Sequence, residues 1–415
     1  MTANSFFLLF LVGEFLSFLL GEIIAFSTYF HRKRGGEKIP PFAEQFLDRR
    51  TEERSDEYYR ARFAFGQISA TISFILGLAL VLLGYYPWLY SLFDFSSMYI
   101  QSVLFLTLME VPGVLLGIPF SLYREFVLEK RFGFSNTTAG LWLSDLLKNT
   151  LISLVLNAAI FSALVAILFF LGSAWWYVAG IFLIVFSLGF TVIYPIWIQP
   201  LFNKYVPLEN GSLRDRLTEL LEAEGFSLKK VFVVDESRRS NHSNAYCSGF
   251  GRNKRIVLYD SLMKTLSEDE IVAVFAHELG HARKKHIAKR LSVSFVMLFI
   301  ALKLASLFIM NEELFRAFGF EEINPAVGLF LVFLVFSNYP SFLSWIGNYF
   351  SRKQEREADE FAKMKLKGGL HLASALMKLQ AQNLSNSQPS KLEVFFNYSH
   401  PTVFMRVEYL LEEEK

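Results

Sequence analysis

The chain has 415 residues, of which 53% are hydrophobic, 45 are Phe and only 19% are charged. Soluble domains usually hold about 45–50% apolar and about 25% charged residues, so this composition excludes an ordinary soluble protein and indicates a membrane protein. The net charge of +2 is too small to support nucleic-acid binding, and the basic residues cluster beside apolar segments, as expected at a membrane surface.

Seven apolar segments are long enough to cross a hydrocarbon core of about 30 Å as helices. We interpret the first as a retained span because Glu14 and Glu22 interrupt it and no small-residue cleavage site follows. Glu110 and Lys303 also lie within spans, where ionisable residues usually face a bundle interior or a water-filled cavity. The predicted spans are 5–27, 68–90, 99–121, 150–172, 175–199, 291–310 and 324–346.

Basic residues alternate between the two sides of the membrane along the chain. Residues 28–66 are rich in Lys and Arg, whereas residues 91–98 have neither and residues 311–322 are mainly acidic. By the positive-inside rule, this pattern predicts an amino terminus that is outside or lumenal. The regions 200–290 and 347–415 are predicted to be cytoplasmic.

Two short strands are predicted in the connection between the fifth and sixth spans. Residues 230–235 and 255–259 are rich in β-branched and other apolar residues. Turn-forming residues punctuate the gap between them, which predicts a hairpin-like connection. These turn residues are Gly249, Gly251 and Asn253.

A zinc-binding motif follows the second predicted strand. His277 and His281 are four residues apart, so on a helix they share one face and can bind one zinc ion. Glu278 between them can take a proton from a zinc-bound water, as in metallopeptidases. Ser267 and Glu270 predict a capping box at the start of this helix. An HExxH string alone should occur by chance in roughly one chain in a hundred of this length.

A third zinc ligand is expected on another helix, because catalytic zinc sites often combine two histidines with a carboxylate. Residues 351–359 form a helix-favouring stretch after the last span, and Glu355 is our choice within it. Spacing alone would allow Glu357 or Glu360 nearly as well, and a solvated charged helix face is the alternative. Asp359, one turn further on, could orient a neighbouring ligand. Seven spans would bring both ligand-bearing helices to the same side of the membrane.

The remaining candidate histidines have no pattern typical of ligands. His286 lies nine positions after His277, which turns it to a different face of a continuous helix. We therefore interpret it, together with His31, His242 and His371, as a surface or packing residue.

With the zinc motif and seven spans in place, the chain resembles the CAAX prenyl protease 1 family, integral-membrane zinc metallopeptidases that trim the carboxyl terminus of prenylated proteins. The resemblance covers nearly the whole chain. It is carried by YREFVLEKRFGF (123–134), YPIWIQPLFNKY (194–205), HSNAYCSGFGRNKRIVLYDSL (242–262), HELGH (277–281), NYFSR (348–352) leading to Glu355 and Ala358-Asp359, and Ser399-His400-Pro401 with Arg406.

The resemblance implies a chamber walled by seven helices, with the zinc site facing it from the cytoplasmic end. It also implies Glu355 as the third ligand, through the pattern SRxxExxAD. His400 and Arg406 become candidates for oxyanion and substrate contacts, and Asp359 for orienting a zinc-bound histidine or assisting proton transfer. Asn244, beside a possible edge strand, becomes a candidate anchor for a substrate amide, with a turn-forming role as its alternative.

The resulting expectation is a mainly α, multi-pass membrane protein with a cytoplasmic, zincin-like α+β catalytic domain and one Zn²⁺ per chain. Its predicted partners are the lipid bilayer and a peptide or protein substrate, prenylated at a carboxyl-terminal cysteine in the case of a CAAX substrate. The sequence is compatible with either the bacterial inner membrane or the endoplasmic reticulum membrane. The predicted parts are 1–199 with five spans, 200–290 with the HExxH helix, 291–346 with two spans and 347–415 with the third ligand.

Three other functions fit the sequence less well. An HtpX-like quality-control endopeptidase would use the same zinc chemistry without a prenyl requirement, but such proteins have fewer spans and lack the long amino-terminal half. A non-catalytic scaffold with structural zinc would favour four closed protein ligands and would not need Glu278. A cysteine nucleophile is disfavoured because Cys247 is the only cysteine and no residue pattern around it suggests a second catalytic site.

Overall fold

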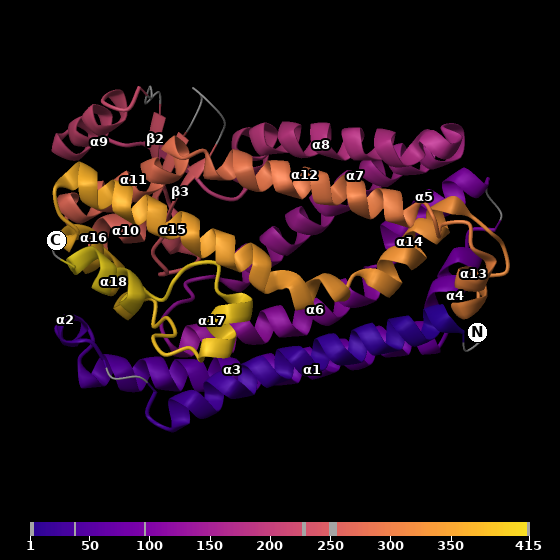
Figure 1. Ribbon diagram of the computed structural model, residues 1–415, viewed down its shortest axis with the longest axis horizontal. Coiled ribbons are helices and arrows are strands. Elements are labelled where there is room, and N and C mark those ends of the chain that lie inside the picture. Colours follow the sequence, from indigo (N-terminus) through magenta and orange to yellow (C-terminus); the bar gives the residue numbers. More distant parts are fainter. Residues whose placement is uncertain (1–3, 37–38, 95–96, 226–229, 249–254, 413–415) are drawn as a thin grey trace.

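The computed structural model describes residues 4–36, 39–94, 97–225, 230–248 and 255–412. Long helices run along its longest axis, and short helices gather with a small sheet at the end that carries the carboxyl terminus (Figure 1). The amino terminus lies at the opposite end. The prediction of a mainly α fold is confirmed.

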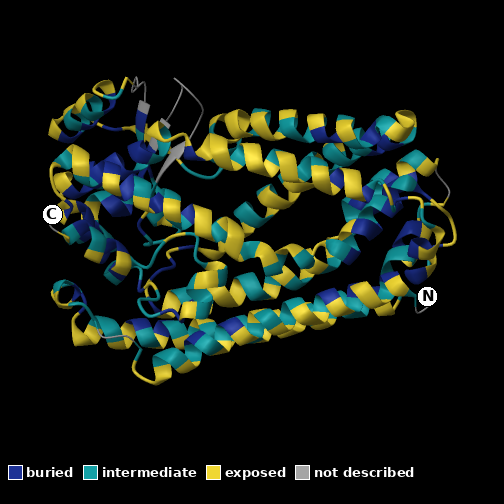
Figure 2. Cartoon of the chain, in the orientation of Figure 1, coloured by how far each residue is buried: buried dark blue, intermediate teal, exposed yellow. Residues whose placement is uncertain are grey.

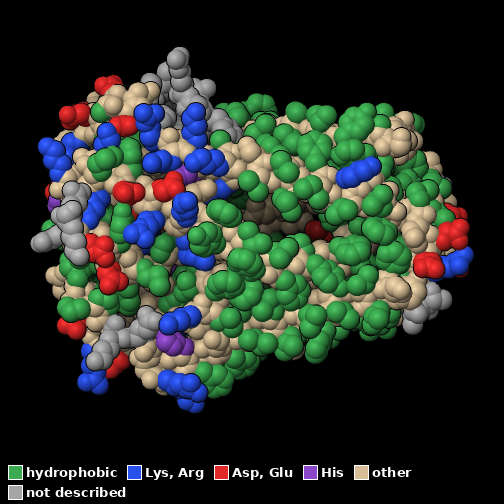
Figure 3. All heavy atoms as spheres, viewed as in Figure 1, with side chains coloured by type: hydrophobic (Ala, Val, Ile, Leu, Met, Phe, Trp, Pro, Cys, Tyr) green, Lys and Arg blue, Asp and Glu red, His purple; other side chains and the backbone are tan. Residues whose placement is uncertain are grey.

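Five helical segments among the described residues are long and apolar enough to cross a membrane. Exposed and intermediate residues dominate the middle of the molecule (Figure 2), where hydrophobic side chains form a broad belt (Figure 3). Because an apolar surface of this extent requires lipid around it, the chain is a multi-pass membrane protein. The segments are α1 (Ser5–Lys33), α3 (Arg49–Leu82), Met98–Glu129 with α5 (Met98–Leu108) and α6 (Val111–Tyr123), α7 (Ala139–Phe170), and Gly172–Leu201 with α8 (Trp175–Ile193).

The second span ends earlier than the sequence predicts. Helix α3 ends at Leu82, and Gly84 follows with a φ of 70°, a left-handed conformation that glycine adopts without strain. The residues predicted to complete the span form a separate short helix, α4 (Tyr85–Ser91), that begins directly after this glycine.

The last two predicted spans are less regular than the first five. Helix α12 (His286–Ala305) does not qualify as a span, because every membrane-length stretch of it holds three basic residues. Helices α14 (Pro325–Phe336) and α15 (Ser344–Leu366) qualify only as one span broken by a bend of 45°. The described part of the chain thus has five or six candidate spans, and the count of seven stays a prediction. The basic residues are Lys289, Arg290 and Lys303.

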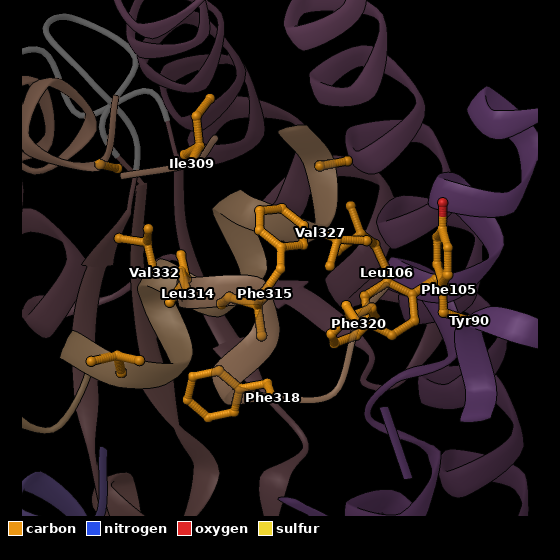
Figure 4. Close-up of a cluster of buried hydrophobic side chains, with 14 of the residues drawn as sticks. Tyr90, Phe105, Leu106, Ile309, Leu314, Phe315, Phe318, Phe320, Val327 and Val332 are labelled. Atoms are coloured by element: carbon orange, nitrogen blue, oxygen red, sulfur yellow. The ribbon is translucent and has the colours of Figure 1, made fainter. Parts of the chain in front are cut away.

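The amino-terminal end has its own core, built from α1, α4, α5, α14, the short helix α13 (Glu312–Ala317) and the nearby ends of α3, α7, α8 and α12. Figure 4 shows part of this cluster, which includes the fully buried Phe105. Asn324 lies within the cluster, and its amide nitrogen donates to the hydroxyls of Tyr90 at 2.9 Å and Ser102 at 2.8 Å. Its amide oxygen accepts from two backbone amides and caps α14. This core holds the helices together far from the sheet.

The small sheet has the strand order β1-β2-β4-β3. The predicted hairpin is wrong, because β2 and β4 pair in parallel and β3 lies on the far side of β4. After β2 the chain leaves the sheet, where Arg239 bonds to Asp145 of α7 at 2.8 Å, and it returns at the other edge. The predicted turn residues Gly249, Gly251 and Asn253 lie outside the described residues. The strands are β1 (Tyr205–Pro207), β2 (Lys230–Val234), β3 (Ala245–Ser248) and β4 (Arg255–Tyr259).

Helix α11 (Glu268–Arg283) lies at the centre of the carboxyl-terminal end and packs against α15. The predicted capping box of Ser267 and Glu270 is confirmed. Gly280 allows the close approach of the two helices, because a Cβ atom there would lie 3.0 Å from the Cα of Ala358. The other short helices at this end are α2 (Pro41–Glu44), α9 (Ser212–Glu222), α10 (Asp260–Thr265), α16 (Leu370–Gln382), α17 (Lys391–Asn397) and α18 (Val403–Leu411).

Candidate metal centre

Three side chains from α11 and α15 converge on one point. The Nε2 atom of His277 is 3.2 Å from Oε2 of Glu355, and the Nε2 atom of His281 is 3.2 Å from Oε1 of the same carboxylate. The two Nε2 atoms are themselves 3.2 Å apart. One ligand atom from each residue lies within 4.8 Å of the others, a grouping that can hold a metal ion.

The chemistry of these donors fits a metal ion. Glu355 is 2% exposed, and its Oε2 atom has no hydrogen-bond partner among the described residues. The Nδ1 atoms of His277 and His281 both have other polar neighbours, so both Nε2 lone pairs are available at the same point. Two imidazole nitrogens and one carboxylate form a ligand set found at catalytic zinc, where a fourth position stays open.

A buried ion pair lies beside Nδ1 of His277, the ring nitrogen that faces away from the converging ligand atoms. Asp359 Oδ1 lies 2.8 Å from His277 Nδ1, and Arg406 donates to both oxygens of Asp359 at 2.8 and 2.6 Å. Burial and the Arg406 charge lower the pKa of His277, but the Asp359 bond and the neighbouring Glu355 carboxylate outweigh them and the pKa is raised. Surroundings that favour a protonated imidazole at a buried position also favour a metal cation there.

The outer side of His281 contacts a second histidine that the sequence interpretation underrated. The Nδ1 atom of His286 is 3.0 Å from Nδ1 of His281, and its Nε2 atom is 3.1 Å from Glu357 Oε2. The prediction that His286 faces elsewhere assumed one continuous helix and is wrong. Helix α11 ends at Arg283, and Lys285, with a φ of 57°, redirects the chain so that α12 begins at His286. His286 is fully buried, but it is not part of the metal-binding group found among the described residues.

His400 lies on the cavity side of the carboxylate ligand. Its Nε2 atom is 3.3 Å from Glu355 Oε1, and its Nδ1 atom is 2.9 Å from the Ser399 hydroxyl. Burial lowers the pKa of His400 and so favours a neutral ring. If Ser399 donates to Nδ1, the Nε2 proton can donate into the cavity. Arg352 of α15 fixes the preceding segment 394–398 by donating to two of its carbonyl oxygens, at 2.9 and 2.7 Å.

A cavity of about 380 Å³ opens in front of the metal-binding side chains. Asn244 and Ala245 line one part of it, where the edge strand β3 begins. Asn244 is exposed, and its amide oxygen accepts from the Ala245 backbone at 2.8 Å. Asp359 is the one predicted site residue that does not line the cavity, because it lies behind His277. Those that do are His277, Glu278, His281, Glu355, His400, Arg406 and Asn244.

The start of α11 is anchored by a buried carboxylate. Glu270 is 4% exposed and accepts from Ser374 at 2.6 Å and from Lys378 at 2.8 Å, which joins α11 to α16. Burial raises the pKa of Glu270, but the bonds to Lys378, Ser374 and the Ser267 backbone outweigh it and lower the pKa. The helix that carries both histidines is therefore fixed about two turns before His277 and about three turns before His281.

A membrane protein with such a metal-binding group beside a cavity belongs to the class of membrane metallopeptidases. Residues 28–204 match a family model described as CAAX prenyl protease N-terminal, five membrane helices, and residues 207–414 match peptidase family M48. The chain belongs to the CAAX prenyl protease 1 family of M48 zinc metalloendopeptidases, and the resemblance noted in the sequence is confirmed.

Individual relatives match nearly the full length of the chain. A CAAX prenyl protease 1 homologue of Arabidopsis thaliana is 35% identical over 373 residues, which are 88% of each chain. CAAX prenyl protease 1 of Saccharomyces cerevisiae is 32% identical, covering 93% of this chain and 92% of its own. The crystal structure of S. mikatae Ste24p has a TM-score of 0.90 and 30% identity, covering 99% of this chain and 100% of its own.

Proposed function

We propose that this metallopeptidase cleaves a peptide bond near the carboxyl terminus of proteins that end in a prenylated CAAX sequence. The observation that supports this most directly is the convergence of His277, His281 and Glu355 beside one cavity. Relatives that are named CAAX prenyl proteases match nearly the full length of the chain.

We propose that one Zn²⁺ per chain is held by His277 Nε2, His281 Nε2 and Glu355. When bound, it would polarise the scissile carbonyl and activate a water molecule. The unpartnered Oε2 atom of Glu355 and the two converging Nε2 atoms support this assignment. Asp359 would orient His277 by accepting its Nδ1 proton.

Glu278 is proposed as the general base, because it follows His277 on α11 and lines the cavity. It would take the proton of the attacking water and pass it to the leaving amine. The Nε2 proton of His400 would stabilise the developing oxyanion. Arg406 was also a candidate for this contact. Its guanidinium is bonded to Asp359, so we propose that it holds that carboxylate and leaves the oxyanion to His400.

The substrate is proposed to enter as an extended strand. The edge position of β3 beside the cavity would allow main-chain pairing, with Asn244 anchoring a substrate amide. A hollow opens between the long helices within the hydrophobic belt (Figure 3), and it supports a chamber that could admit the lipid group. Seven spans around this chamber, a cytoplasmic metal centre and the four-part division of the chain are parts of the same proposal. The membrane would be the bacterial inner membrane or the endoplasmic reticulum membrane.

The proposal is tested by comparing two peptides that differ only in farnesylation of the CAAX cysteine. Purified protein and its Glu278→Ala variant are assayed on both peptides, with bound zinc quantified. Cleavage confined to the farnesylated peptide, and lost in a variant that retains zinc, supports the proposal. Zinc-dependent cleavage of both peptides at similar rates would reject the prenyl requirement and favour a broader quality-control peptidase. Full activity of the variant would reject the role of Glu278.

A further inference from the structure

The two histidines of the metal-binding group differ in what holds their outer nitrogen. His277 Nδ1 faces a carboxylate directly, since Asp359 Oδ1 is 2.8 Å away. His281 Nδ1 faces the ring of His286 at 3.0 Å, and that ring in turn faces the Glu357 carboxylate at 3.1 Å. Both outer nitrogens therefore lead to a carboxylate, but on the His281 side one imidazole lies between.

One assignment of protons satisfies the whole chain of contacts. With its Nε2 atom directed at the metal position, His281 carries its proton on Nδ1 and can donate it to Nδ1 of His286. His286 then carries its own proton on Nε2 and donates to Glu357, which accepts as a carboxylate. Each nitrogen has one partner and one role, and no proton is shared between two donors.

The surroundings support a fixed ring. The side chain of His286 is 1% exposed, whereas that of Glu357 is 30% exposed. The ring is thus enclosed by protein, and the carboxylate lies at the boundary of the enclosed region. Because α12 begins at His286 after the turn at Lys285, the His286 ring is carried by a different helix from His281.

We infer that His286 and Glu357 are positioning residues that fix the orientation of His281 for zinc. The inference rests on the proposed zinc site and adds to it a second, relayed support. Groups that accept a proton from the far side of a metal-bound imidazole hold the ring and increase its basicity, and their loss typically weakens metal affinity by about 10–100-fold. His286 itself does not contact the metal position or the substrate.

The test measures zinc affinity by chelator competition, together with the visible absorption of the Co²⁺-substituted protein. His286→Leu is expected to weaken zinc binding by about 10–100-fold and to alter the Co²⁺ spectrum. His286→Gln should retain most of the zinc affinity and a Co²⁺ spectrum close to that of the parent protein. Its amide oxygen can accept from His281, and its amide nitrogen can donate to Glu357. Rescue by glutamine distinguishes positioning from simple packing.

Glu357→Gln supplies a second, less disruptive variant, because this side chain is partly exposed. It should weaken zinc binding by less than His286→Leu, since the amide oxygen still accepts from His286 but carries no charge. Glu360→Gln is the matched control, because Glu360 is an exposed carboxylate on the same helix, and it should leave affinity and spectrum unchanged.

Two results would overturn the inference while leaving the proposed function intact. One is wild-type zinc affinity with an unchanged Co²⁺ spectrum in folded His286→Leu. The other, decisive if that variant does not fold, is wild-type zinc affinity together with an unchanged Co²⁺ spectrum in Glu357→Gln. Failure of the parent protein to bind zinc, or full zinc binding by Glu355→Ala, would instead reject the proposed zinc site.

Discussion

At the amino-terminal end, Asn324 has both side-chain polar atoms bonded within the protein, whereas at the metal centre Glu355 keeps one buried oxygen without a hydrogen-bond partner among the described residues. Both side chains are almost completely buried. A satisfied buried amide stabilises the helices that it joins. An unsatisfied buried carboxylate costs free energy unless a ligand completes its coordination.

Stability and chemistry depend on opposite ends of this protein. The amino-terminal core is closed, because its polar groups bond one another and its aromatic side chains fill the remaining space. The metal centre is open, because its polar groups converge on a point that protein atoms do not fill. Substitutions in the amino-terminal core should therefore reduce stability, whereas substitutions of the metal-binding side chains should reduce metal binding.

The largest effect is expected from Glu355→Ala. Removing the carboxylate leaves two imidazoles for a metal that usually needs three protein ligands at a catalytic site, so zinc content should fall from about one per chain to near zero, with loss of peptidase activity. Elemental analysis of the purified protein measures this. Glu360→Ala on the same helix is the control, and a fully zinc-loaded Glu355→Ala protein would contradict the ligand assignment.

Asn324→Ala should show the opposite behaviour. It removes a helix cap and leaves the buried hydroxyls of Tyr90 and Ser102 with fewer partners, which should cost about 2–4 kcal/mol of unfolding free energy. Zinc content per folded molecule should not change. Thermal unfolding in detergent measures the loss, with Asn311→Ala as a milder control, because Asn311 caps α13 with its side chain partly exposed. Equal effects of the two variants would mean that the buried contacts of Asn324 contribute little.

Gly280→Ala should affect stability and metal binding together, because the new Cβ atom would meet the backbone of α15 at Ala358. Overpacking of this kind typically costs about 1–3 kcal/mol. It should also separate α11 from α15 by a few tenths of an ångström and so weaken zinc binding. Chelator competition and thermal unfolding on the same sample measure both effects. Lower stability with unchanged zinc affinity would show that the helix spacing tolerates the extra methyl group.

The smallest effect is expected from Glu270→Gln, about 1–2 kcal/mol at neutral pH. The pKa of Glu270 is lower in the folded protein than in an unfolded chain, so its stabilisation is present above the unfolded value of about 4.3 and lost as pH falls through the folded value. The parent protein should therefore lose more stability on acidification than Glu270→Gln. Unfolding midpoints measured from pH 7 down to about pH 2 would test this, and parallel curves would contradict it.

Local sequence patterns predicted the parts of the molecule that depend on neighbouring residues. The spacing of His277 and His281 and the capping box of Ser267 and Glu270 are properties of one helix, and both can be read without a fold. The first five spans were predicted for the same reason, since hydropathy is a property of a single segment. The third zinc ligand was different. Spacing alone allowed Glu355, Glu357 or Glu360, and only the family resemblance favoured Glu355.

The features that were missed depend on backbone turns or on distant partners. The positive φ of Lys285 has no sequence signature comparable to glycine, so the break that brings His286 back to His281 was not predicted. The parallel pairing of β2 and β4 was missed because β3 pairs on the far side of β4 and not between them. The break before His286 had one available signal in the sequence, a histidine five residues after the zinc-binding His281.

The two helices that carry the metal-binding residues are joined by the chain that runs through α12, α13 and α14 to the amino-terminal core. A metal ion bound by His281 and Glu355 would therefore close a ring of polypeptide that reaches from one end of the molecule to the other. A cross-link that closes a long loop restricts the unfolded chain. Removing the metal with a chelator at one end should consequently make the helices at the other end easier to unfold, although no atom of the metal centre touches them.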